Sequence, residues 1–205
     1  HNALDQIINN YKLFVVSLRR KITLILVVLF LIVFCLKGWL FRSCFSYCDS
    51  GKRGSNVLIS EDLRQYADSI AASETPTDVM DVVMLANEIT SEHLMFRSTS
   101  NEINPNTLFT YHRTHCVGYA AFFQVVCNYL LVKFNFDNEW SCSAHVGRIY
   151  FMTMDVHRFF KSPFFKDHDF NIIRKKSENE AIYVDATLYD YFGIATVTPS
   201  EFNQE

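Results

Sequence analysis

The chain has 205 residues, of which 49% are hydrophobic and 20% charged, and its formal net charge is -3. This composition excludes a disordered or low-complexity chain, and a charge so close to neutral argues against a general nucleic-acid binder, which needs a basic field. The length allows one domain of ordinary size and an appendage. The charge is divided unevenly along the chain, since residues 1–53 carry a net +6 and residues 54–205 a net -9.

The N-terminal part contains an uncharged apolar run at residues 22–36, in which Thr23 is the one polar residue. Extended to residues 22–41, the run has twenty residues, which as a helix span about 30 Å, the thickness of a bilayer core. Lys37 can extend its stem to the headgroups, and Trp39 suits the interface. We therefore predict a transmembrane helix at residues 22–41. A buried core helix is the alternative, but it normally shows a polar stripe, which this run lacks.

Three basic residues, Arg19, Arg20 and Lys21, adjoin the N-terminal end of this run. Basic residues beside a membrane span favour the cytoplasmic side, so we predict that residues 1–21 face the cytoplasm and that the globular part faces a periplasm or the exterior. The residues after the run are bulky and lack the small-residue pattern of a cleaved signal peptide, so we expect an uncleaved anchor.

Residues 42–56 are predicted to be a juxtamembrane linker, because residues 51–56 are rich in Gly, Ser and Asn. The six cysteines are spread too widely for a disulfide scaffold. Cys44 and Cys48 lie four residues apart just beyond the membrane run. A bridge between them, acylation, or two unremarkable thiols are all compatible with this spacing.

Two helices are predicted at the start of the globular part. Ser60 precedes two acidic residues and caps a helix that runs to about residue 72. Thr75 is a capping residue and Pro76 suits a first helical position, so a second helix should start there and run to about residue 94.

The remaining elements change from helix to strand along the chain. After a polar loop at residues 101–107, a helix at residues 116–133 is apolar on nearly every face and should be buried. β-branched and aromatic residues then predict strands at residues 146–154 and 181–184. Helices followed by strands indicate an α+β domain over residues 57–205.

Three residues at the ends of these elements have the chemistry of a thiol enzyme. Cys116 begins the buried helix, where unsatisfied N–H groups and the positive helix end should lower its thiol pKa. His145 opens the first strand and Asp185 follows the second, so adjacent strands would bring a base and an orienting acceptor to the thiol. Cys127, further along the same helix, is expected to be an inert core residue. Each residue alone is weak evidence, since such residues more often serve packing or capping.

Two motifs surround the cysteine and the aspartate: Arg113-x-x-Cys116-x-Gly118-Tyr119-Ala120 and Tyr183-Val184-Asp185-Ala186-Thr187. With the order Cys, His, Asp they resemble the transglutaminase-like superfamily, a branch of the papain-like thiol enzymes, over roughly residues 60–195. The resemblance implies a papain-like core of helices followed by an antiparallel sheet. It also implies that Cys116 is the nucleophile, His145 the general base and acid, and Asp185 the group that fixes the imidazole tautomer. The backbone N–H of Cys116 would be one oxyanion donor.

Three features depart from the usual pattern of this family. His115 precedes the cysteine, where a small residue is usual, and Gly147 lies two residues after His145, where an aromatic residue is common. The interval from His145 to Asp185 is forty residues instead of a short strand hairpin, and the excess maps to about residues 156–179.

The inserted residues 156–179 interleave basic and aromatic side chains in an otherwise acidic domain. One hypothesis is a lid or contact surface that touches the membrane interface or a partner. The other, which we favour, is an additional hairpin whose Phe side chains fill the core of the domain.

We predict a membrane-anchored cysteine enzyme that acts on amide bonds of a protein or peptide by thioester acyl transfer, as a peptidase or amidase rather than a crosslinker. The alternative is a non-catalytic interaction module or a subunit of a membrane protein complex. The expected partners are the membrane, through residues 22–41, and a membrane protein, with no nucleic acid. His112-x-x-His115-Cys116 has metal-binding side chains, but no second cluster completes a site, so no metal or other cofactor is predicted.

Overall fold

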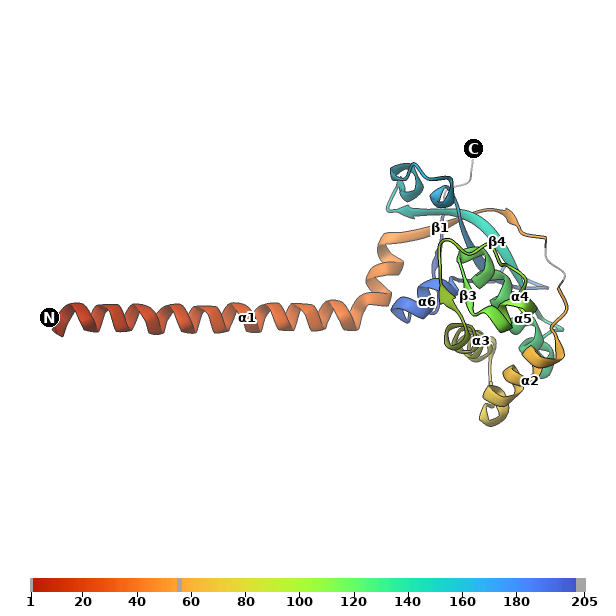
Figure 1. Cartoon of the computed structure of the whole chain (residues 1–205), viewed down its shortest axis with the longest axis horizontal. Coiled ribbons are helices and arrows are strands. Elements are labelled where there is room, and N and C mark those ends of the chain that lie inside the picture. Colours follow the sequence, from red (N-terminus) through yellow and green to blue (C-terminus); the bar gives the residue numbers. More distant parts are fainter. Residues whose placement is uncertain (1, 55–56, 202–205) are drawn as a thin grey trace. The chain divides into compact units, whose positions relative to one another are not determined.

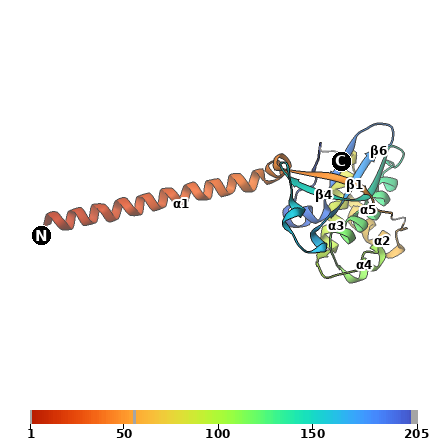
Figure 2. The same cartoon turned by 90° about the horizontal axis from the view of Figure 1, so that it is seen from above.

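The computed structural model describes the backbone of residues 2–54 and 57–201, so the end of the predicted linker, residues 55–56, lies outside the described residues. The chain divides into two units, residues 1–40 and residues 41–205. Figures 1 and 2 show the long helix of the first unit and the helices and strands of the second.

The first unit consists of helix α1, Asn2–Cys44, whose last residues belong to the second unit. Every residue at positions 18–36 is exposed, although most of these side chains are large and apolar. A helix that is apolar on all sides and exposed needs nonaqueous surroundings. Therefore α1 has the properties of a membrane anchor or a signal sequence, and the predicted span at residues 22–41 lies within it.

Among the described residues, two helices are long and apolar enough to cross a membrane: Leu18–Cys44 within α1, and α5, Cys116–Lys133. They differ in burial, since no residue in the apolar window of the first helix is buried, whereas α5 is mostly buried. Burial on most faces is typical of the central helix of a globular domain. Of these two helices, α1 is the one that presents its apolar surface to the outside.

The second unit is an α+β domain. Its other helices are α2 (Glu61–Ile70), α3 (Val79–His93), α4 (Pro105–Tyr111) and α6 (Ala186–Phe192). Its longer strands are β1 (Phe45–Lys52), β4 (Trp140–Phe151), β6 (His168–Lys175) and β7 (Ala181–Val184). Its short strands are β2 (Met95–Phe96), β3 (Arg113–Thr114), β5 (Met154–Asp155) and β8 (Thr198–Pro199).

Within the described residues, six strands form one sheet with the order β7-β6-β4-β1-β8 and β5 paired to β4 off this path. The pairs are antiparallel except β1 with β8. A bridge between Tyr183 of β7 and Val197, just before β8, connects the two edges, so the sheet is nearly closed into a barrel. In both views the helices α2 to α5 lie together on one side of the strands (Figures 1 and 2).

Strand β1 occupies most of the segment predicted as a linker, residues 42–56. It pairs with β4 along its whole length, and Tyr47 within it is buried. The register shifts between Asp49 and Gly51, and Gly51 has a φ of 144°, a conformation that favours glycine. The glycine that suggested a linker thus makes an irregularity within a strand.

The starts of the first two helices are decided by their caps. Ser60 caps α2 as predicted. Helix α3 begins later than Thr75 and Pro76 predicted, because Asp78 caps it. The Asp78 carboxylate accepts from the backbone N–H of Asp81, whose side chain accepts in return from the backbone N–H of Asp78. This capping box satisfies two N–H groups at once, and a single threonine cap does not.

Of the two predicted strands and the predicted loop, the structure confirms one strand and differs at the other strand and the loop. The strand predicted at residues 181–184 is β7, whereas the strand predicted at residues 146–154 begins six residues earlier, as β4. Pro105, within the predicted loop, instead occupies the first turn of α4, where a missing N–H costs nothing because the first turn has no intrahelical acceptors for these groups.

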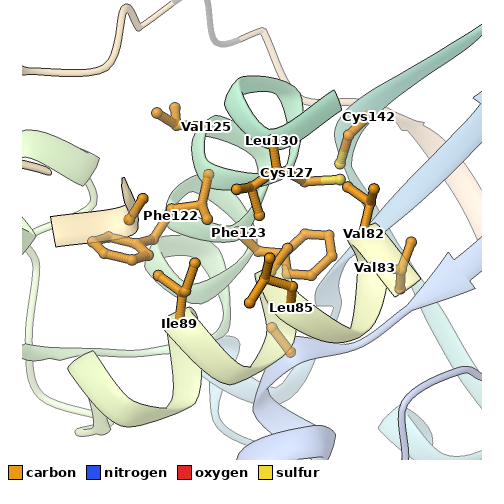
Figure 3. Close-up of a cluster of buried hydrophobic side chains, with 14 of the residues drawn as sticks. Val82, Val83, Leu85, Ile89, Phe122, Phe123, Val125, Cys127, Leu130 and Cys142 are labelled. Carbon is orange, nitrogen blue, oxygen red and sulfur yellow. The ribbon is translucent and has the colours of Figure 1, made fainter. Parts of the chain in front are cut away.

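Helix α5 has the predicted bounds and is buried on nearly every face. Figure 3 shows Phe122 and Phe123 of α5 packed with Val82 and Ile89 of α3 in the main core. Helix α5 also contacts β4 and β6. Cys116, its first residue, is therefore held by a helix that is packed on several sides.

The predicted insertion at residues 156–179 contains two different structures. Its second half contains the whole of β6, in which Ile172 and Ile173 are fully buried. Its first half contains two short 3-10 turns, Val156–Phe159 and Pro163–Phe165, and both Phe159 and Phe165 are exposed. The core-filling hairpin therefore describes only the second half, and the aromatic residues of the first half lie on the surface.

Gly118, in the first turn of α5, provides a test of this packing. A Cβ at this position would lie 1.9 Å from Oγ1 of the buried Thr114, which donates to the carbonyl of Glu102 at 2.7 Å. We expect Gly118→Ala to lower the free energy of unfolding by about 1–3 kcal/mol, as other overpacked sites do. Urea unfolding in detergent, followed by tryptophan fluorescence, measures it. Gly54→Ala, with nothing within 4 Å of the new Cβ, should stay within about 1 kcal/mol of the parent chain, and an equal loss in both variants would contradict the packing argument.

Candidate active site

Cys116 begins α5 and is 8% exposed. His115 is the N-cap residue, with its Nδ1 accepting from the backbone N–H of Val117 at 3.3 Å and its carbonyl accepting from the N–H of Tyr119 at 3.0 Å. The chain therefore enters the helix at the cysteine, and the thiol is carried by the first turn, at the positive end of the helix.

The histidine that meets this thiol is His168, the first residue of β6. Its Nε2 donates to Oδ2 of Asp185 at 2.7 Å, and its side chain lies close enough to Cys116 to lower the pKa of the thiol. Because Nε2 is engaged by the carboxylate, Nδ1 is the ring nitrogen left for the thiol. The three side chains therefore lie together, although they come from α5, from β6 and from the residue after β7.

His145, the predicted base, lies elsewhere. Its Nδ1 is 2.9 Å from Oδ1 of Asp49, and its Nε2 is 3.0 Å from Oγ of Ser143. The cause is the strand order, because β6 lies between β4, which carries His145, and β7, which precedes Asp185. The predicted adjacency of these two strands is wrong, and a side chain on β4 is one strand too far from Asp185.

Asp185 lies directly after β7, as predicted, and accepts four hydrogen bonds. Oδ2 accepts from His168 and from Oη of Tyr47, the latter at 2.8 Å. Oδ1 accepts from the backbone N–H groups of Thr187 and Leu188 at 3.0 and 3.1 Å, so the same carboxylate caps α6. A buried carboxylate needs donors for both oxygens, and Asp185 has two for each.

The surroundings of Cys116 favour the thiolate. Burial raises the pKa of its thiol, but hydrogen bonds with the side chains of His115 and His168, together with the charge of His168, outweigh burial and lower the pKa to about 6. The backbone of Asp169 acts in the same direction. At neutral pH the sulfur is therefore mostly the thiolate, the form that attacks carbonyl groups. Cys142 differs, because burial raises the pKa of its thiol.

The partners of the thiol are charged as well. Burial lowers the pKa of His168, but the charge and hydrogen bond of Asp185 and the contact with Cys116 raise it well above its usual value. Burial raises the pKa of Asp185, and the charge of His168 with the hydrogen bonds from His168 and Tyr47 bring it below its usual value. The shifts thus favour the protonated imidazole and the ionised carboxylate beside the thiol.

Two neighbouring contacts hold the start of β6 in place. Buried Asp169 accepts from Nε and Nη2 of Arg53 at 2.8 and 2.9 Å, which ties the residue after β1 to the residue after His168. Gly147, opposite His168 in β4, lies against the carbonyl of Cys48, where a Cβ would be only 2.1 Å from the oxygen. A glycine is therefore required there by the close approach of β1 and β4.

The sequence interpretation missed His168 and Tyr47. His168 carried two signals, since Phe170 follows two residues later and Asp185 only 17 residues later. These are the features that His145 lacks. Tyr47 carried no signal, because it lies in a segment whose composition predicted a linker.

Cavity size does not locate the site. A pocket of about 850 Å³ opens where the C-terminal ends of α3 and α4 meet β2 and β3. Cys116, His168 and Asp185 are not among the residues that line it. The site is recognised by side-chain chemistry instead.

In the part of the chain that the structure describes, the metal-binding side chains of His112-x-x-His115-Cys116 are not joined by further ligands, and no three His, Cys, Asp or Glu side chains gather to hold an ion. His112 places its Nδ1 3.2 Å from the carbonyl of His93. His115 packs edge-on against Phe164, with ring centroids 5.6 Å apart.

No protein-family model matches the chain, and no curated protein matches it. The chemistry of the site is therefore interpreted from its own geometry.

The pH dependence of thiol alkylation tests the assignment of His168. The rate of reaction of Cys116 with iodoacetamide should fall as the pH falls through about 6, since protonation removes the thiolate. In His168→Ala the midpoint should rise above ~8.5, the ordinary value for a thiol, because burial then acts without the opposing charge. Mass spectrometry of alkylated peptides from the full chain in detergent measures both.

His145→Ala is the matched control and should leave the midpoint near that of the parent chain. A midpoint that moves in His145→Ala and not in His168→Ala would return the role to His145.

Proposed function

We propose that the chain is a membrane-anchored thiol enzyme that acts on amide bonds, with Cys116 as nucleophile, His168 as general base and acid, and Asp185 as the residue that orients the imidazole. The observation that carries the proposal is the hydrogen bond from His168 to Asp185, with the imidazole beside the Cys116 thiol at the start of a buried helix. A nucleophile, a base within reach and an acceptor that orients the base are the parts that thiol catalysis requires.

The reaction uses these groups in two stages. The Cys116 thiolate attacks the amide carbonyl carbon, and the negative charge that develops on oxygen is stabilised by the backbone N–H of Cys116 in the first turn of α5. The C–N bond breaks as His168 gives its proton to the leaving nitrogen, which leaves a thioester and an amine. His168 then takes a proton from water, the hydroxide attacks the thioester, and the thiolate departs from a carboxylic acid.

The molecule that accepts the acyl group from the thioester determines the class of enzyme. Water makes it a peptidase or amidase, and an amine makes it a crosslinker. We propose hydrolysis of a protein or peptide, by analogy with compact thiol enzymes of a single domain.

Assigning the role of the base to His168 instead of His145 supports the transglutaminase-like resemblance. Phe170 provides the aromatic residue two positions after the histidine, and β6 and β7 form an antiparallel hairpin between His168 and Asp185. Two of the three departures from the family pattern therefore disappear. His115, in place of a small residue before Cys116, is the departure that stays.

The exposed apolar helix supports the location. We propose that α1 is an uncleaved anchor with residues 1–21 on the cytoplasmic side, following the basic residues at its N-terminal end. The globular domain then works on the outer side of the membrane.

Acylation by 4-nitrophenyl acetate tests the chemistry without a known substrate. The full chain should release a burst of nitrophenol and gain one acetyl group on Cys116. His168→Ala should slow acylation by about 100-fold or more, the usual contribution of a general base. Cys127→Ala and His145→Ala are the matched controls and should react like the parent chain. Equal rates in His168→Ala and His145→Ala would contradict the proposal.

The product that carries the acetyl group shows whether water or an amine accepts it from Cys116. With a fluorescent primary amine added, hydrolysis should still consume most of the acyl-enzyme, as followed by acetate release against fluorescent amide. A product that is mainly the amide would make the protein a transferase.

A non-catalytic module is the second candidate, favoured by the low exposure of Cys116 and by the bulky His115 before it. This candidate predicts that Cys116 is not acylated faster than Cys127 or Cys142, although the domain is folded.

A further inference from the structure

One end of the sheet displays large apolar side chains to the outside. They come from the end of β4, from β5 and from the two 3-10 turns that follow it. They are Phe151, Met152, Met154, Phe159, Phe160 and Phe165. Phe159 is 72% exposed and Met152 is 65% exposed, so neither side chain is part of the hydrophobic core.

The same stretch is basic, in a domain that is acidic as a whole. Arg158, Lys161 and Lys166 are exposed among the aromatic residues. Of the two acidic residues between positions 151 and 167, Asp155 is buried and paired with Arg148 at 2.7 Å, so Asp167 is the exposed one. Residues 54–205 nevertheless carry a net -9. We call the six apolar and three basic side chains together the apolar-basic surface.

A buried histidine holds this surface in shape. His157 accepts from the backbone N–H of Ile149 through Nε2 at 3.1 Å, so its proton is on Nδ1, which donates to the carbonyl of Phe165 at 2.8 Å. Asp155 accepts from the N–H of His157 at 2.9 Å. The two 3-10 turns are therefore fastened to β4, and their aromatic side chains project from a fixed base.

The surface adjoins the first residues of the second unit, at positions 41–45. The N–H of Met152 donates to the carbonyl of Cys44, the last residue of α1, at 2.7 Å. The rings of Phe45 and Phe151 lie 5.1 Å apart, and Phe41 stacks on Phe45 at 4.6 Å. These residues all belong to the second unit, and Phe41 is joined by one peptide bond to the last residue of the first.

We propose that the apolar-basic surface lies in the headgroup region of the bilayer that holds α1, with its aromatic side chains at the boundary between headgroups and acyl chains and its basic side chains on anionic lipid phosphates. The proposal rests on the proposed membrane anchor. Interleaved aromatic and basic residues are the composition that binds an anionic lipid surface. Covalent continuity with α1 keeps this surface close to the lipid.

This placement narrows the substrate class. Phe164, within the same segment, packs edge-on against His115, the cap residue before Cys116, and the segment continues through Lys166 directly into His168. The lipid-bound segment therefore contacts the residue that precedes the thiol and leads into the base. The substrate would be a polypeptide segment at the membrane surface, close to the point where it leaves the bilayer.

Photocrosslinking to lipid tests the surface in the intact chain. The chain is placed in nanodiscs of phosphatidylcholine and phosphatidylglycerol that contain a phospholipid with a photoreactive headgroup. Mapped crosslinks should fall on residues 151–166 as well as on α1. The variant Phe159→Ser, Phe160→Ser, Lys161→Glu, Lys166→Glu should lose crosslinks at residues 151–166 by about tenfold, and so should the parent chain in phosphatidylcholine alone.

The control variant changes two exposed apolar and two basic residues elsewhere: Leu58→Ser, Met95→Ser, Lys175→Glu, Lys176→Glu. Its crosslinks at residues 151–166 should equal those of the parent chain. Crosslinks on α1 with none at residues 151–166 would overturn the proposal and leave a protein as the occupant of this surface. An absence of crosslinks on α1 would overturn the anchor and this inference together. Acetylation of Cys116 in the same nanodiscs reports on the proposed enzyme independently of both.

Discussion

A buried carboxylate connects the fold to the candidate chemistry. Asp185 receives hydrogen bonds from β1 through Tyr47, from β6 through His168 and from the first turn of α6. A charge in this interior is costly unless its oxygens have donors, so these elements are held in register by a shared electrostatic requirement. The same bond that satisfies Asp185 turns the imidazole so that its other nitrogen is left for Cys116. Stability and thiol activation thus depend on one group.

Local sequence patterns predicted the elements whose information is local. The apolar content of α5, the Ser60 cap and the β-branched residues of β7 identified these elements, and Cys116 and Asp185 were found because each lies at the end of one. Which histidine lies beside Cys116 depends on the strand order. That order is set by pairing between distant segments, so no short stretch of sequence predicts it. The same is true of β1, whose polar and glycine residues become a strand only because β4 and β8 pair with it.

The exposed basic side chains of the acidic domain lie in a defined part of its fold. The acidic excess is spread over the domain, whereas the exposed basic and aromatic side chains of the first half of the insertion gather at the end of the sheet where β6 begins. His168 is the first residue of β6. The proposed chemistry and the proposed lipid contact therefore belong to one end of the domain, and the segment between positions 156 and 167 is common to both.

Strand β1 begins at Phe45, directly after the last residue of α1, Cys44. Proteases often release the soluble part of an anchored protein by cutting just outside the membrane. A cut within β1 would instead divide a strand that lies between β4 and β8, and it would separate Tyr47 from the domain or leave it on a frayed end. Asp185 would lose the hydroxyl that this strand supplies. A cut in this strand would therefore disrupt the proposed site instead of releasing an intact domain.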